Sequence, residues 1–98
     1  MDAERGRGEP VVRMPVRLDV GTSATVRAAL HGALDTQEGD LVIDLAAVEV
    51  VDAAGLGVLV GVRRRADGVG RVVVLRDTPP RVQRLLNATH LTRLFVLD

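Results

Sequence analysis

Residues 42–60 read V-I-D-L-A-A-V-E-V-V-D-A-A-G-L-G-V-L-V, and this segment is the most informative part of the chain. It begins within a short, almost continuous apolar run, Leu41–Leu45, which predicts a buried strand. Asp52 then interrupts the apolar residues, and beyond it Leu56 and Leu59 recur with helical spacing. We therefore expect a turn that presents the N-terminus of a helix, where backbone N–H groups are free to bind an acceptor.

Strand and helix patterns alternate on both sides of this segment. Residues 11–18 are expected to be extended, with Pro15 confining them to an edge or dividing them into two short strands. A first helix is expected to begin at a cap formed by Thr22 or Ser23, and its apolar stripe comprises Val26, Ala29, Leu30, Ala33 and Leu34. A second helix is expected over about residues 53–67, followed by a strand over residues 71–75. Pro79 and Pro80 open a third helix, which carries Val82, Leu85 and Leu86 on one face, and a short strand ends the chain. This alternation predicts an α/β domain with parallel strands in the middle of its sheet.

Composition excludes several classes of function. The 98 residues carry 13 acidic and 13 basic side chains, so there is no basic footprint for nucleic acid. All the basic residues are Arg, which removes Schiff-base and P-loop lysine chemistry. The absence of Cys excludes disulfides, thiolate catalysis and Cys-based zinc sites. Phe95 is the only aromatic residue, so the core must be aliphatic, as suits a buried parallel sheet covered by helices.

The chain is long enough for one domain and too short for two. Residues 1–10 mix Gly, Arg and acidic side chains without an apolar period, so we expect a disordered lead-in followed by one domain over residues 11–98. The lead-in lacks the apolar region of a signal peptide. The longest uncharged apolar stretch, residues 53–62, falls short of the roughly 20 residues that a membrane-spanning helix needs. We therefore expect a cytoplasmic protein that does not insert into a membrane.

The central turn resembles a family signature. Bacterial anti-sigma factor antagonists, the single-domain STAS proteins, carry a strand ending in Asp-Leu and then Asp-Ser-Ser-Gly-Leu-Gly at the start of a helix. Here Asp44 and Leu45 are followed at matching spacing by D-A-A-G-L-G over residues 52–57. The resemblance implies a small STAS-type α/β domain whose mixed sheet has parallel central strands and helices mainly on one face. It also implies a serine-kinase anti-sigma factor of the GHKL type as partner, no cofactor, and a partner-binding surface formed by Asp19, Asp52, Ala53, Ala54, Gly55, Leu56 and Gly57.

One residue departs from the family pattern. In the family the second serine of this turn is the phosphorylation switch, and this chain has Ala54 there. Because alanine has no hydroxyl to accept a phosphoryl group, the resemblance implies an antagonist that is not switchable at the usual site. Thr22, Ser23 or Thr25 could be modified instead. A second interpretation is a STAS subunit or scaffold that binds the ATPase of a lipid-type ABC transport complex, where no phosphorylation is needed.

The residues of this region also admit structural explanations. Asp52 fits a helix N-cap, whose carboxylate is stabilised by the positive end of the helix dipole. Gly57 and Gly61 lie four residues apart in the predicted helix, where glycine is unfavourable, so they fit close backbone approach to the sheet or to a partner. Asp19, Asp44 and Asp52 could form a metal site, although no acidic pair is adjacent in sequence.

The remaining candidates for chemistry are weak. His31 and His90 have no Ser, Cys or Glu neighbour at catalytic or metal-binding spacing, so surface positions are favoured. Arg63–Arg65 fits a solvated helix end better than a phosphate site. Since no nucleophile, base and orienting group can be assembled, we expect a binding protein rather than an enzyme, and no bound metal.

Overall fold

The computed structural model describes residues 3–6 and 9–98. Its elements in chain order are the strands β1 (Ala3–Gly6), β2 (Glu9–Arg13) and β3 (Arg17–Leu18), helix α1 (Ser23–Thr36), strands β4 (Leu41–Asp44) and β5 (Val50–Val51), helix α2 (Ala53–Gly68), strand β6 (Val73–Arg76), helix α3 (Pro80–Ala88), the 3₁₀ turn η1 (Thr92–Leu94) and strand β7 (Val96–Leu97). Every helix and strand that the sequence predicts is present, and β1 and β5 are strands that it did not predict.

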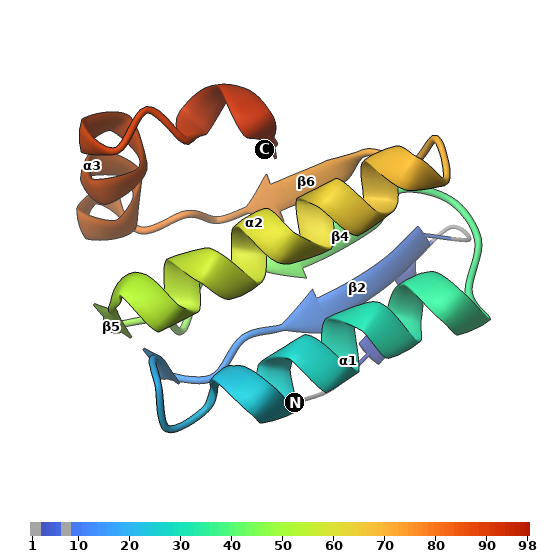
Figure 1. The fold of residues 1–98 in the computed structure, drawn as a ribbon, viewed down its shortest axis with the longest axis horizontal. Helices are drawn as coiled ribbons and strands as arrows, with labels where there is room; N and C mark the ends of the chain where they lie inside the picture. Colours follow the sequence, from blue (N-terminus) through green and yellow to red (C-terminus); the bar gives the residue numbers. More distant parts are fainter. Residues whose placement is uncertain (1–2, 7–8) are drawn as a thin grey trace.

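The main sheet has five strands in the order β1-β2-β4-β6-β7. β1 runs antiparallel to β2, and every later pair in this sheet is parallel, so the sheet is mixed with parallel central strands. A second, two-stranded parallel sheet joins β3 to β5. Helices α1 and α2 lie side by side across one face of the main sheet, and α3 lies at the same end of the molecule as β5 (Figure 1). The predicted fold class is confirmed.

The hydrophobic core is aliphatic apart from one ring. Alternate residues of the central strands, among them Val12, Ile43 and Leu75, face the buried sides of the helices, where Leu30 and Leu59 are almost fully inaccessible to solvent. Phe95 closes this core near the C-terminus. The described residues of the core thus form one continuous cluster, which holds both sheets and all three helices together.

The N-terminal prediction needs correction. In place of a disordered lead-in over residues 1–10, the described residues of this stretch form β1 and the start of β2, paired as an antiparallel hairpin. β1 reads A-E-R-G, which has no strand pattern of its own, so its conformation follows from hydrogen bonding to β2. Of the two alternatives expected at Pro15, an edge strand or a break between two short strands, the structure has the break, because β2 ends at Arg13 and β3 begins at Arg17.

The start of α1 also differs in detail from the prediction. Thr22 occupies the cap position, but its side chain makes no capping hydrogen bond to the helix. Its hydroxyl instead donates to the carbonyl of Arg17 at 2.8 Å and accepts from the backbone N–H of Asp19 at 3.1 Å. Thr22 therefore orders the loop before the helix.

A candidate partner-binding surface at the start of α2

Asp52 caps α2, as predicted. Its Oδ1 accepts a hydrogen bond from the backbone N–H of Gly55 at 3.0 Å, and its backbone carbonyl accepts from Leu56 N–H, also at 3.0 Å. Its second oxygen, Oδ2, accepts from the backbone N–H of Val20 at 3.0 Å. The hydrogen bond from Gly55, assisted by that from Val20, lowers the pKa of Asp52 below its usual value. This carboxylate therefore joins the α2 N-terminus to the loop before α1.

The loop before α1 is held in place by its own polar contacts. Asp19 accepts from Gly21 N–H at 2.9 Å through Oδ1, and its Oδ2 pairs with Arg17 Nε at 2.9 Å. Val20, at the tip, is 76% exposed. Because Val20 N–H binds Asp52, the fold brings the predicted site residues Asp19 and Asp52 into one neighbourhood although they are far apart in sequence.

The predicted site residues on α2 differ in accessibility. Ala53 and Gly57 are exposed, whereas Ala54 and Leu56 are half-buried. Gly55 is buried, and a Cβ on it would lie 2.1 Å from the carbonyl oxygen of Leu18, which also accepts from Asp52 N–H. Ala53, Ala54, Leu56 and Gly57 can therefore meet a partner directly, while Gly55 allows α2 to approach β3.

The expected close approach at Gly57 and Gly61 is wrong where the sheet is concerned. A Cβ at either position would meet no atom within 4 Å. The close approach lies at Gly55, which the sequence did not distinguish from the other glycines. Gly57 is exposed and Gly61 is half-buried, and neither position carries a side chain that would obstruct an incoming surface.

Other predicted candidates lie apart from this surface. Asp44 Oδ1 accepts from the N–H of Ala46 at 2.9 Å, and within residues 3–6 and 9–98 no three acidic or histidine side chains gather as a metal site would require. His31 is half-buried on α1, and His90 lies exposed after α3.

The arginine run at the end of α2 is not simply a solvated helix end. Arg63 Nε donates to the carbonyl of Leu94 at 3.1 Å, and Arg65 Nη2 pairs with Asp35 at 2.5 Å. These contacts join α2 to η1 and to α1. Of these three arginines, Arg64 alone is exposed and makes no hydrogen bond or ion pair with a described residue.

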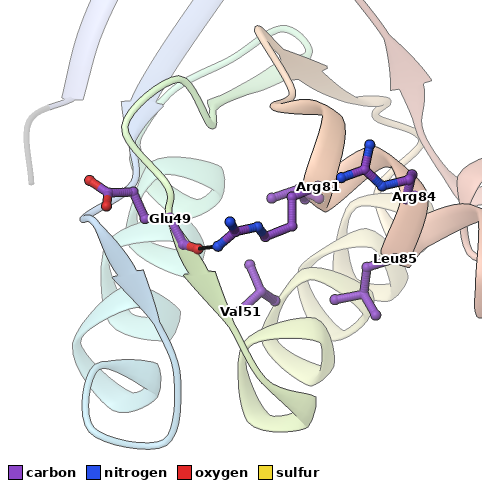
Figure 2. Close-up of a pocket in the computed structure, with 6 residues that line it drawn as sticks. Glu49, Val51, Arg81, Arg84 and Leu85 are labelled. Carbon is purple, nitrogen blue, oxygen red and sulfur yellow. Dashed lines mark hydrogen bonds between the residues drawn. The ribbon is translucent and has the colours of Figure 1, made fainter.

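A hollow next to the α2 N-terminus has no counterpart among the predicted site residues. It lies between β5 and α3, measures about 300 Å³ and is lined by Val51, Val82 and Leu85, with Arg81 and Arg84 from α3 and Glu49 from the other side (Figure 2). Val51 immediately precedes Asp52 in the chain, so the hollow adjoins the candidate surface. The sequence places Leu85 on the apolar face of α3, but only the tertiary structure places it across the hollow from Val51.

No helix in the described part of the chain combines the length and apolar character needed to cross a membrane.

A family model described as "STAS domain" matches residues 1–98. An anti-sigma F factor antagonist of Paenibacillus polymyxa is 30% identical over 95 residues, covering 96% of this chain and 81% of that protein.

Two solved structures share the fold over almost the whole chain. An anti-sigma-factor antagonist (STAS) domain protein from Planctomyces limnophilus superposes with a TM-score of 0.87 at 19% identity, covering 98% of this chain and 86% of that one. The Bacillus cell fate determinant SpoIIAA, in its phosphorylated form, gives a TM-score of 0.75 at 18% identity, covering 99% and 89%.

Proposed function

The chain belongs to the STAS domain family, and we propose that it is an anti-sigma factor antagonist that binds a serine-kinase anti-sigma factor of the GHKL type. The observation that carries this proposal is the α2 N-terminus, where the capped turn at Asp52 leaves Ala53 and Gly57 exposed on an open helix face. The protein acts by binding and not as an enzyme. Since the proposed partner controls a transcription factor, the proposed site of action is the cytoplasm.

The partner surface comprises the exposed turn and the loop that Asp52 holds beside it. Asp19 and Asp52 supply negative charge, and Ala53, Ala54, Leu56 and Gly57 supply a flat apolar area without long side chains. Most of the carboxylate hydrogen bonds come from the protein's own backbone, so the turn is preorganised before a partner arrives. Little conformational entropy is then lost on binding.

The usual switch is absent from this surface. A phosphoserine in place of Ala54 would add about −1.5 to −2 charges next to Asp52, and would oppose binding through repulsion and desolvation. Alanine cannot accept the phosphoryl group, so the binding-competent state is permanent as far as this position is concerned.

The nearby hydroxyls differ in their availability as substitutes. Thr22 donates to the carbonyl of Arg17, and Ser23 Oγ donates to the carbonyl of Val20 at 3.3 Å. Thr25 is exposed, and its side chain makes no hydrogen bond to a described residue. If a kinase modifies one of the three, Thr25 is therefore the favoured position.

The first experiment measures binding of the purified chain to the GHKL-type kinase encoded in the same genome. Gly57→Arg places a long charged side chain on the proposed surface at a position where a Cβ meets nothing within 4 Å, so it should abolish binding without unfolding the protein. Gly68→Arg is the matched control, because Gly68 is equally open but lies at the far end of α2. Equal affinity of the two variants would contradict the proposed surface.

The second experiment restores the switch. Ala54→Ser should gain one phosphoryl group on incubation with the kinase and ATP, as seen by intact mass, and should then dissociate from the partner, whereas the native chain stays bound. Failure of both forms to bind any GHKL-type kinase, or capture of an ABC transporter ATPase in its place, would overturn the proposal.

A further inference from the structure

The hollow between β5 and α3 has an apolar floor. Val82 is buried, while Val51 and Leu85 are half-buried and lie on facing sides of the hollow (Figure 2). Its volume of about 300 Å³ lies at the lower limit of small-molecule pockets, and suits one large side chain better than a cofactor. Filling it would remove the remaining exposed surface of Val51 and Leu85 from water.

The rim of the hollow is positively charged. Arg81 donates from Nη1 to the carbonyl of Glu49 at 3.1 Å, so its guanidinium spans the opening with other N–H groups still free to donate. Arg84 is exposed and makes no hydrogen bond or ion pair with a described residue. The carboxylate of Glu49 is directed away from both arginines, and no ion pair joins it to either of them (Figure 2).

No acidic side chain of α3 offsets this charge. Residues 78–97, which include all of α3, contain three Arg and no Asp or Glu, although the whole chain has equal numbers of acidic and basic side chains. A segment that enters the hollow therefore meets arginines without competing carboxylates on α3. Carboxylates pair with arginine through two parallel hydrogen bonds, which favours acidic flanking residues in such a segment.

We propose that this hollow binds one large apolar side chain of a partner protein, presented by a segment whose flanking residues are acidic and pair with Arg81 and Arg84. The inference rests on the proposed function in one respect: Val51, which lines the hollow, immediately precedes Asp52 of the α2 surface, so the partner proposed for that surface is also the one proposed for the hollow. The hollow predicts that this partner carries a large apolar side chain flanked by acidic residues, which the α2 surface alone does not predict.

The test uses the full chain labelled with ¹³C in its Val and Leu methyl groups. The probe is a synthetic hexapeptide with a central Leu-Phe pair flanked on each side by two glutamates; companion peptides carry lysine flanks or a central Ala-Ala pair. The acidic Leu-Phe peptide should shift the methyl resonances of Val51, Val82 and Leu85 with saturation, and the companions should not. Equal shifts from acidic and lysine flanks, or none at these three residues, would overturn the proposal.

Charge reversal supplies the matched variants. Arg84→Glu should weaken binding of the acidic peptide about tenfold and allow the lysine-flanked peptide to bind, because it turns an attraction into a repulsion. Arg93→Glu, an exposed arginine of the same acid-free stretch that does not line the hollow, should leave both affinities unchanged. An equal loss in the two variants would show a nonspecific charge effect and refute the site.

The two proposals can fail separately. Gly57→Arg should leave peptide binding intact, so peptide binding without any kinase binding would refute the proposed function and retain the hollow as a docking site. Kinase binding that Arg84→Glu leaves unchanged would refute the hollow and retain the proposed function.

Discussion

Asp52 carries more of the local structure than any other residue at the candidate surface. As a helix cap it satisfies the N–H of Gly55, and through its second oxygen it holds Val20, 32 residues earlier in the chain. The capping role follows from a carboxylate directly before a helical pattern, so it could be predicted from sequence. The bond to Val20 could not, because it depends on the parallel pairing of β3 with β5.

Asp52 should make stability depend on pH in a defined direction. Its pKa is lowered in the folded protein, so its ionised form contributes stability that is present above the unfolded value of about 3.9 and is lost as the pH falls through the lower, folded value. Asp52→Asn retains a capping oxygen but cannot ionise. Urea unfolding should therefore show the native chain more stable than Asp52→Asn at neutral pH, with the difference shrinking below about pH 4. A difference that stays constant with pH would contradict this role.

Among the elements, α2 illustrates how identical residue types take opposite roles. Gly55 is enclosed by the backbone of Leu18, whereas Gly57 and Gly61, on the same helix, face open space. Sequence spacing singled out the second pair because glycine is unfavourable inside a helix. Spacing could not single out Gly55, because its close contact with the backbone of Leu18 exists only when β3 lies beside the N-terminus of α2.

The glycines of α2 should respond to alanine with opposite signs. Gly55→Ala should destabilise the protein by about 3 kcal/mol, since its Cβ would clash with a backbone carbonyl that cannot swing aside. Gly57→Ala should stabilise it by about 0.8–1 kcal/mol, the difference in helix propensity. Chemical denaturation of both variants gives the free energies of unfolding. A stabilising effect at both positions would show that α2 can move away from β3.

At the scale of the whole molecule, stability depends on one aliphatic cluster. Residues from both sheets and from α1, α2 and α3 contribute to it, and the buried side chains among the described core residues are all apolar. The arginines at the end of α2 add ties between elements at the periphery. The domain is therefore expected to unfold as one cooperative unit, as small single-core domains do.

Truncation within this cluster should affect the entire domain. Leu59→Ala should cost about 2–5 kcal/mol, because it opens a cavity where α2 faces the sheet. Val20→Ala, on an exposed loop, should change stability by no more than about 0.5 kcal/mol. Thermal unfolding followed at once by circular dichroism and by methyl NMR should show coincident transitions for Leu59→Ala. Early loss of α2 alone would contradict a single cooperative core.

The sequence alone determined the α/β class, the order of the three helices and of every strand except β1 and β5, the cap at Asp52 and the presence at position 54 of an alanine, which has no hydroxyl. Each of these depends on the identity of a residue or on the periodicity of apolar residues over a few neighbours, and both can be read from a short stretch of sequence. Tertiary structure decided the pairing of β1 with β2, the enclosure of Gly55, the bond from Val20 to Asp52 and the hollow between β5 and α3. Apart from the β1–β2 hairpin, these features join residues that are distant in sequence. All of them arise only when strand pairing and helix packing bring backbone groups together, and no local sequence pattern encodes that geometry.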